Sequence, residues 1–384
     1  MDVGFLKPLF DRPGPWACVY LDTSRATEDA PTRRRLRERF VSEQLARQGA
    51  DTATRDALVE RLAGERTGRP SAGRALFAAD GEVVLDLPLA ASPPDVVTSW
   101  SMLPRVAPLA SLRGEWPSCL VARVDRSGAD LELLDDAGPR PAGRARGGSP
   151  QGRGHRSVPA DRHEWHYRNR VENTWDQTAD LVAGELARRW PESDARLLVL
   201  AGEPRERRAV HERLPEPLRG LAVEAQHGSR AAGSARALLE AEIERAREEY
   251  ARSHLEEVLD LFRAARGRPG EPGVGGAHDG SAPGGAAEGM PAVVEAVRSH
   301  QAATLLLGQT GADARREVWI GPGVDQVAVQ RAQVRALGVA APEPARADDA
   351  LVRSAAAADT EVLVVPEGMA GPAGGLGAVL RWHR

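Results

Sequence analysis

The features that this 384-residue sequence lacks exclude several classes of protein. No uninterrupted apolar run approaches the roughly 18 residues that a transmembrane helix needs, so a membrane protein is excluded. Cysteine occurs only as Cys18 and Cys119, both inside apolar runs, which excludes a disulfide framework and predicts buried free thiols. Residues 1–16 contain no basic start followed by an apolar run, so we expect no export signal and a cytoplasmic protein.

Lysine is almost absent, because Lys7 is the only lysine among 51 basic residues and the other 50 are arginines. Together with the abundant alanine, glycine and proline, this composition is typical of a GC-rich genome. An isolated arginine is therefore weak evidence for guanidinium-specific chemistry. The net charge of −4 also excludes binding of nucleic acid through the charge of the whole molecule, so only local clusters of basic residues are informative.

The common motifs of metal and nucleotide sites are absent too. The sequence has no CxxC, HExxH, EF-hand loop or Gly-x-Ser-x-Gly elbow, and its glycine-rich segments 321–323 and 371–377 lack the lysine and Ser/Thr of a phosphate-binding loop. His163 and His166 could bring two imidazoles together, but a third ligand is missing, so we predict no metal and no cofactor. Asp22 ends a strand, where catalytic carboxylates occur, yet Asp-Thr-Ser is also a common turn and helix-cap sequence.

The length predicts two or three domains, and strands alternate with helices along the chain. We predict an α/β fold of three α/β domains in series: an N-terminal domain at 1–114, a middle domain at 115–230 and a C-terminal domain at 231–384. Half of the residues in 268–289 are glycine or proline, so we expect a flexible insertion there.

Hydrophobic periodicity predicts the individual elements. In the N-terminal domain we expect a strand at 16–22, helices at 31–48 and 52–66, and a hairpin of 74–79 with 82–87 around Asp80-Gly81. The first helix is expected to bury one face made of Leu36, Phe40, Val41 and Leu45. Farther along we expect a hairpin at 118–134, a long connection at 137–164, a helix at 165–190 closed by Pro191, a strand at 196–201, a helix at 204–213, a strand at 221–225 and a helix at 234–266. The C-terminal domain is expected to contain helices at 291–299, 324–336 and 346–358 and strands at 303–307, 319–320, 361–365 and 376–382.

Residues 140–170 stand out by charge. They contain eight arginines against only Asp161 and Glu164, a local excess of six positive charges in an acidic chain. Arginines bind phosphates, aromatic rings stack on unpaired bases, and glycines let the backbone approach closely. We therefore predict an RNA-binding loop whose contact residues are Arg144, Arg146, Gly147, Gly148, Gln151, Arg153, His155, Arg156, His163, Trp165, His166, Tyr167, Arg168 and Arg170. The alternative is an arginine-rich surface loop that reflects codon bias alone.

These segments also carry a family resemblance. A strand ending in Val19-Tyr-Leu-Asp-Thr-Ser24 leads into a basic helix, and a glycine/arginine loop leads into a helix that begins at His166-Tyr-Arg-Asn-Arg170. Downstream lie Ala303-Thr-Leu-Leu-Leu-Gly308 and Thr360-Glu-Val-Leu-Val-Val-Pro366. In this order the motifs resemble the bacterial archaeo-eukaryotic release factor/Pelota-like family, which includes the Balon-type ribosome hibernation factors. The resemblance covers essentially the whole chain and implies a C-terminal domain similar to a ribosomal-protein fold.

In release factors of that family, a Gly-Gly-Gln tip helps water to cleave peptidyl-tRNA. This chain instead reads Gly147-Gly148-Ser149-Pro150-Gln151, so its glutamine is displaced by two residues. A catalytic amide must lie within hydrogen-bond distance of the ester, and we therefore expect no release activity. Stop-codon motifs are also missing from 1–110, so codon-specific termination is not expected.

The resemblance implies a non-enzymatic factor that binds the aminoacyl-tRNA site of the bacterial ribosome and contacts ribosomal RNA or tRNA. Its function would be hibernation or rescue under stress, with elongation factor Tu or another translational GTPase as partner. One alternative is a peptidyl-tRNA or tRNA hydrolase that uses Gln151 or the set His155, His163 and His166. A second is a stress protein that binds a small ligand and has no RNA partner.

Overall fold

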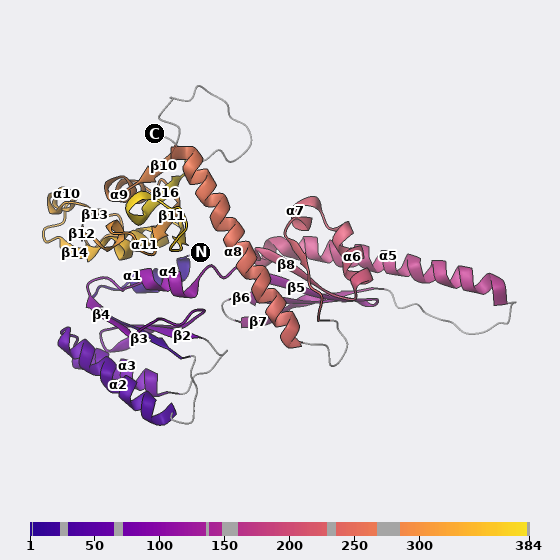
Figure 1. Ribbon diagram of the computed structural model, residues 1–384, viewed down its shortest axis with the longest axis horizontal. Coiled ribbons are helices and arrows are strands. Elements are labelled where there is room, and N and C mark those ends of the chain that lie inside the picture. The colour runs from indigo at the N-terminus through magenta and orange to yellow at the C-terminus, as the bar shows by residue number, and fades with distance from the viewer. Residues whose placement is uncertain are drawn as a thin grey trace, which may run out of the picture. The chain divides into compact units, whose positions relative to one another are not determined.

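The computed structural model describes residue 1 and residues 3–23, 30–64, 72–135, 138–147, 160–228, 236–266 and 285–381; it leaves out the side chains of residues 30–34 and 160–175. These residues form a mixed α/β protein, as predicted (Figure 1). They group into two compact units, one that combines Met1–Glu115 with Leu255–Arg384 and one that spans Trp116–His254. The division into domains at 1–114, 115–230 and 231–384 stays a prediction.

The N-terminal part of the first unit contains an antiparallel sheet in the order β3-β2-β1-β4. Its strands are β1 (Trp16–Asp22), β2 (Gly73–Ala79), β3 (Glu82–Leu89) and β4 (Val97–Ser101). The predicted hairpin between β2 and β3 is confirmed, and its turn residues Asp80 and Gly81 both have positive φ angles, 50° and 76°. Two positive φ angles in a two-residue turn match the right-handed twist of the flanking strands.

Strand β1 is buried on both faces, because successive side chains of a strand point to opposite sides. Ala17, Val19 and Leu21 pack against helices α2 (Ala30–Arg47) and α3 (Thr52–Ala63). Trp16, Cys18 and Tyr20 join a second core that includes residues of the C-terminal part of the same unit. The N-terminal sheet therefore depends on residues from the far end of the sequence.

Helix α2 buries a narrower face than predicted. Val41 and Leu45 are fully buried against β1, but Leu36 and Phe40 are 63% and 43% exposed. Helix α3 begins at Asp51, whose carboxylate accepts a hydrogen bond of 2.8 Å from the backbone N–H of Thr54. Such a cap satisfies one of the otherwise unpaired N–H groups of a helix start.

The C-terminal part of the first unit contains a sheet in the order β10-β16-β11-β15. Its strands are β10 (Gly285–Glu288), β11 (Ala302–Gly308), β15 (Glu361–Val365) and β16 (Leu376–Leu380), with β11 parallel to β15. A small sheet, β13-β12-β14, is formed by β12 (Glu317–Ile320), β13 (Val327–Ala328) and β14 (Glu343–Arg346). The helices are α9 (Met290–Arg298), α10 (Arg331–Ala336) and α11 (Ala347–Ala357), and α11 is buried along most of its length.

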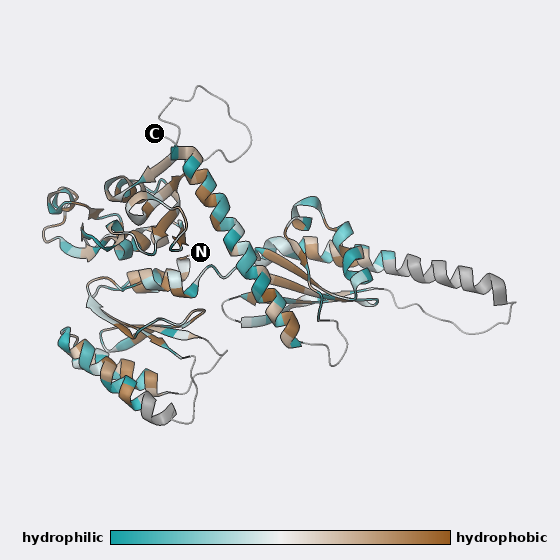
Figure 2. Ribbon diagram, in the orientation of Figure 1, coloured by the Kyte–Doolittle hydropathy of each residue, from teal (hydrophilic) through white to brown (hydrophobic). Residues whose placement is uncertain are grey.

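The second unit is a sheet in the order β7-β6-β5-β8-β9 between two layers of helix. Its strands are β5 (Cys119–Asp125), β6 (Gly128–Asp135), β7 (Gly138–Arg146), β8 (Leu197–Gly202) and β9 (Ala222–Glu224). Helices α5 (Ala160–Ser193), α6 (Pro204–Arg213) and α7 (Glu216–Arg219) contribute to the core on one face. Helix α8 (Arg236–Arg266) covers the other face with Leu239 and Ile243. Figure 2 shows the apolar strands of this sheet between helices with hydrophilic outer faces.

Several elements differ from the sequence prediction. Strand β7 occupies 138–146, where a loop was predicted, and β4 and the short helix α4 (Ala107–Arg113) were missed. Neither strand shows the alternation of apolar residues that identifies a half-buried strand, and both lie at sheet edges. An edge strand tolerates Pro139 and Pro141 because one side of its backbone needs no partner strand. Helix α5 begins earlier than predicted and continues past Pro191 to Ser193.

No helix in the described ranges is long and apolar enough to cross a membrane. The predicted buried thiols are confirmed, because Cys18 and Cys119 are both buried and free. Burial disfavours the thiolate and raises the pKa of each cysteine to about 12. Neither thiol is therefore set up as a nucleophile.

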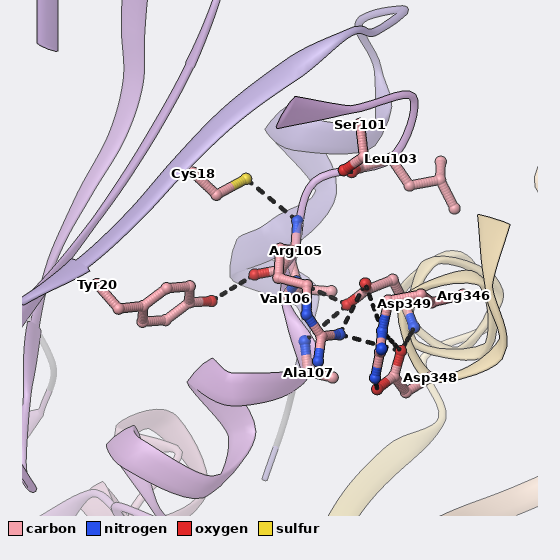
Figure 3. Close-up of polar contacts among 10 residues, drawn as sticks. All are labelled: Cys18, Tyr20, Ser101, Leu103, Arg105, Val106, Ala107, Arg346, Asp348 and Asp349. Carbon is pink, nitrogen blue, oxygen red and sulfur yellow. Dashed lines mark hydrogen bonds and ion pairs between the residues drawn. The ribbon is translucent and has the colours of Figure 1, made fainter. Parts of the chain in front are cut away.

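Within the first unit, the N-terminal and C-terminal parts are joined by a buried charge cluster that Figure 3 shows. The guanidinium of Arg105 donates to Asp348 at 3.0 Å and to Asp349 at 2.8 Å. Asp349 also accepts the backbone N–H groups of Val106 and Ala107, each at 2.9 Å. The carboxylate therefore caps the start of α4 from the first turn of α11.

The position of Arg105 is itself fixed by β1. The hydroxyl of Tyr20 donates to the carbonyl of Arg105, and the backbone N–H of Arg105 donates to the sulfur of Cys18 at 3.1 Å. On the opposite side, Arg346 holds Asp348 at 2.8 Å. The side chains of Asp348 and Asp349 are only 6% and 5% exposed, so the two carboxylates depend on these two arginines for charge compensation.

We expect Arg105→Met to lower the free energy of unfolding of the first unit by about 3–5 kcal/mol, because it leaves two buried carboxylates with Arg346 alone. The measurement is urea denaturation of the full chain. The control is Arg39→Met, which removes an exposed ion pair with Glu43 and should change stability little. Equal decreases in the two variants would contradict the role of the cluster.

The cluster also predicts a pH dependence. Burial, and then the negative charge of Asp348, raise the pKa of Asp349 to about 6. An aspartate of the unfolded chain ionises near pH ~4, so the folded state binds an extra proton between about pH 4 and 6. The stability from this proton is fully present below about pH 4 and is lost as the pH rises through about 6.

Asp349→Asn removes this titration but keeps an oxygen that can accept the N–H groups of Val106 and Ala107. The difference in unfolding free energy between the variant and the natural chain should therefore change between about pH 4 and 6 and be constant above. Asp359→Asn is the control, since Lys7 lowers the pKa of that exposed carboxyl and its effect falls below this range. A constant difference for Asp349→Asn across the whole series would refute the assignment.

Candidate nucleic-acid interface

The candidate interface begins where the chain leaves the sheet of the second unit. The ladder between β6 and β7 runs to the pair Gly128 and Arg146. One residue later, the backbone N–H of Gly147 donates to the carbonyl of Ser127 at 2.8 Å. The hydrogen bond fixes the starting point of the segment 148–159, which connects β7 to α5, beside the β5–β6 turn.

Gly147 is also in direct contact with α5. A Cβ atom at this position would collide with the side chain of Thr178, which is 4% exposed. The backbone directly after β7 can therefore approach the helix this closely only because residue 147 has no side chain. The first glycine of the pair Gly147-Gly148 thus has a packing function.

A second contact between β7 and α5 is made by Arg189. Its guanidinium donates to the carbonyl of Ala142 and to the carboxylate of Glu185. Hydrogen bonds from Arg188 and then Arg189 lower the pKa of Glu185 to about 2. Gly143 has a φ of 132° and leaves the space that the Arg189 guanidinium fills. Helix α5 therefore contacts the edge strand through Arg189 and the residue after that strand, Gly147, through Thr178.

The arginines of β7 have acidic neighbours on β6. Arg140 pairs with Asp135 at 2.8 Å, and Arg144 pairs with Asp130 at 2.8 Å. Arg146 is exposed and forms no ion pair with a residue of the described ranges. The local excess of positive charge that the sequence predicted is thus smaller at β7, because charge counted along the chain misses partners on the adjacent strand.

Both ion pairs nevertheless leave their arginines accessible. The side chains of Arg140 and Arg144 are 60% and 64% exposed. Ion pairs at a surface contribute only about 0–1 kcal/mol, so a phosphate group can compete for these guanidinium groups. Arg140, Arg144 and Arg146 therefore form an accessible basic edge, which we call the β7 edge.

A small cavity of about 260 Å³ lies beside the start of the segment, where β5 ends and α6 begins. Its charged lining includes Arg126, which pairs with Glu206 at 3.2 Å, and Arg205. Thr178, the contact of Gly147, also lines it. The sequence analysis missed this cavity, although parallel strands such as β5 and β8 commonly bind ligands at their carboxyl ends.

The remaining predicted contact residues are not placed by the structure. Gly148, Gln151, Arg153, His155 and Arg156 lie outside the described residues. The backbone of α5 contains His163, Trp165, His166, Tyr167, Arg168 and Arg170, whose side chains lie outside the description. The predicted loop 140–170 is therefore corrected to an edge strand, the segment 148–159 and the beginning of a helix.

Residues 118–268, which include the β7 edge and α5, match the sequence model of bacterial archaeo-eukaryotic release factor family 2. Over this segment the chain is similar to bacterial archaeo-eukaryotic release factors. This release factor-like chain is also 29% identical over 385 residues to the uncharacterized proteins MT2704 and Rv2629 of Mycobacterium tuberculosis strains CDC 1551 and H37Rv. Each alignment covers 98% of this chain and 96% of the relative.

Among solved structures, the release factor-like chain is similar to the archaeal translation termination factor aRF1, with 16% identity and a TM-score of 0.23 over 98% of this chain and 96% of that chain. It is also similar to Dom34 of S. cerevisiae, a translation termination-like factor, with 8% identity and a TM-score of 0.39 over 100% and 94% of the two chains. These TM-scores are below 0.5 and carry no argument, so the similarity to release factors rests on the sequence match of residues 118–268.

The packing of Gly147 leads to a direct test. Gly147→Ala should lower the free energy of unfolding of the second unit by about 1–3 kcal/mol, because the new methyl group overlaps Thr178. The matched control is Gly184→Ala in α5, where no atom lies within 4 Å of the added methyl group. Alanine in a helix interior is favoured over glycine by about 1 kcal/mol, so the control should gain stability. Urea denaturation measures both, and a gain in the Gly147 variant would disprove the contact.

Proposed function

We propose that this chain is a ribosome-associated factor that binds the aminoacyl-tRNA site and acts in ribosome hibernation or rescue under stress. The observation that carries the proposal is the family match of residues 118–268, the part of the chain that contains the β7 edge. The similarity of this segment to bacterial archaeo-eukaryotic release factors supports a function in translation. The proposed site of action is the bacterial cytoplasm, and elongation factor Tu or another translational GTPase is the proposed partner.

Contact with RNA is supported by the exposure of the β7 edge. Three arginines project from one short edge strand, and the segment that follows adds Arg153 and Arg156. Glycine at 147 and the hydrogen bond to Ser127 give this segment a defined starting point. We propose that ribosomal RNA or tRNA phosphates bind the β7 edge and the arginines beyond it.

The proposed action does not include codon-specific termination. Gln151 follows Ser149-Pro150 instead of the glycine pair, so the sequence does not provide the Gly-Gly-Gln tip of a release factor. The first glycine of the pair has the packing contact with Thr178 described above. Occupation of the site, without cleavage of the peptidyl-tRNA ester, is the function that we propose.

The test is cosedimentation of the full chain with intact bacterial ribosomes over a series of salt concentrations. The variant replaces Arg140, Arg144 and Arg146 with alanine. We expect weaker binding, and a plot of log affinity against log salt whose slope falls by about 0.7–0.9 for each phosphate that the variant no longer binds.

The matched control replaces three exposed arginines of the same unit, Arg208, Arg236 and Arg252, which lie on helices. Equal effects in the two variants would show that only net charge matters at this surface. Absence of saturable binding by the natural chain at low salt would overturn the proposed function. Release of the peptide from ribosome-bound peptidyl-tRNA, abolished in Gln151→Ala, would favour the hydrolase alternative.

A further inference from the structure

The first unit contains a cavity of about 360 Å³ that is separate from the β7 edge. Its walls come from the end of α1 (Lys7–Phe10), the segment 102–104, the end of β12 and α11. Leu9, Phe10, Trp16, Leu103 and Ile320 provide apolar surface. A volume of this size matches the lower range of pockets that bind small organic molecules, about 300–1,000 Å³.

Arg353, at the wall of this cavity, is a charged residue that is almost fully buried. The residue is 6% exposed, and its guanidinium donates to the carbonyls of Gly321, at 3.0 Å, and Pro322. Among the described residues, no carboxylate lies within ion-pair distance of it. Burial lowers the pKa of Arg353, and Asp325, which opposes that effect, is hydrogen-bonded to His300 at 2.7 Å.

A buried cation without a paired anion is energetically costly, so a counterion from outside the chain would stabilise it. A guanidinium group has five N–H groups, and the two carbonyls accept only two of them. The others can bind the two oxygens of a carboxylate side by side. Arg353 is thus suited to hold the charged end of an anionic ligand.

The loop that carries the two carbonyls is held in place before any ligand binds. The backbone N–H of Gly321 donates to the carbonyl of Gln326 at 2.7 Å, and that of Gly323 donates to the Gln326 side chain at 2.9 Å. The hydroxyl of Ser354, next to Arg353, donates to the carbonyl of Val324 at 2.6 Å. The guanidinium is therefore fixed in position, which reduces the entropic cost of binding.

The other charged groups of the lining determine which anion fits. Arg12 is paired with Glu82 at 2.6 Å, whereas Asp11 and Glu343 form no ion pair within the described part of the chain. The lining thus contains two carboxylates and the Arg353 guanidinium, and this charge balance disfavours a ligand with two negative charges, such as a phosphate monoester. It favours a ligand that carries a positive charge next to its carboxylate.

We propose that this cavity binds a small carboxylate with an apolar body, that the carboxylate pairs with Arg353, and that an α-ammonium group beside Asp11 and Glu343 strengthens binding. Free apolar amino acids have this chemistry, and their side chains match the walls formed by Phe10, Trp16 and Leu103. Since the N-terminal and C-terminal parts of the first unit both line the cavity, such a ligand would stabilise their contact.

The test is isothermal titration calorimetry of the full chain with three probes that share a phenyl group: phenylalanine, 3-phenylpropionate and phenylethylamine. We expect phenylalanine to bind, 3-phenylpropionate to bind more weakly and phenylethylamine not to bind. Failure of both carboxylates to bind at millimolar concentration would overturn the proposal, as would binding of phenylethylamine equal to that of phenylalanine.

Two variants separate binding from folding. Arg353→Gln keeps a donor for the carbonyls but removes the charge, and it should weaken phenylalanine binding at least tenfold. Substitution of the buried Arg353 can also disturb folding, so a second variant, Glu343→Gln, is included. It should weaken the binding of phenylalanine but not that of 3-phenylpropionate. The control is Glu317→Gln on β12, an exposed position outside the cavity lining, which should change neither. Unchanged binding in both cavity variants would contradict the assignment, whatever the ribosome experiment shows.

Discussion

The first unit depends on one buried interaction, the pairing of Arg105 with Asp348 and Asp349. It joins the segment after β4 to the start of α11, and the same contact brings the N-terminal sheet against the C-terminal core. The burial of Trp16, Cys18 and Tyr20, the start of α4 and the 360 Å³ cavity all require these two parts to meet. A buried ion pair of this kind adds specificity through its fixed geometry, since carboxylates and guanidinium must meet in one register.

How far the sequence predicts this fold depends on whether an element carries its own signal. Strand β1 is continuously apolar and the β2–β3 turn has Asp80-Gly81, so both were predicted within one or two residues. Strands β4 and β7 lack the alternation of apolar and polar residues that identifies a strand. They form because their backbones hydrogen-bond to a neighbouring strand, so the sequence could not identify them. The exposure of Leu36 and Phe40 also depends on which elements α2 packs against, and hydrophobic periodicity does not predict those elements.

The candidate interface shows the same division. Composition led us to predict Arg144, Arg146 and the pair Gly147-Gly148 as RNA contacts, but Arg140 of the β7 edge was not among the predicted contacts. The sequence could not identify Asp130 and Asp135 as partners of Arg144 and Arg140, because those contacts follow from strand register. Nor could it assign Gly147 to a contact with Thr178, thirty-one positions later. Composition locates a basic segment, but the residues that lie next to it in the fold determine which of its arginines are paired and which are accessible.

The separation of the paired residues in the Arg105 cluster has a consequence for synthesis of the chain. Arg105 and Asp349 are 244 positions apart, and the whole second unit is translated between them. At about 5–20 residues per second, the N-terminal sheet waits roughly 10–50 s before its counterpart is made. During that time the core around Trp16, Cys18 and Tyr20 contains only its N-terminal members and lacks those of the C-terminal part. The nascent protein therefore has a period in which the core of its first unit is only partly assembled.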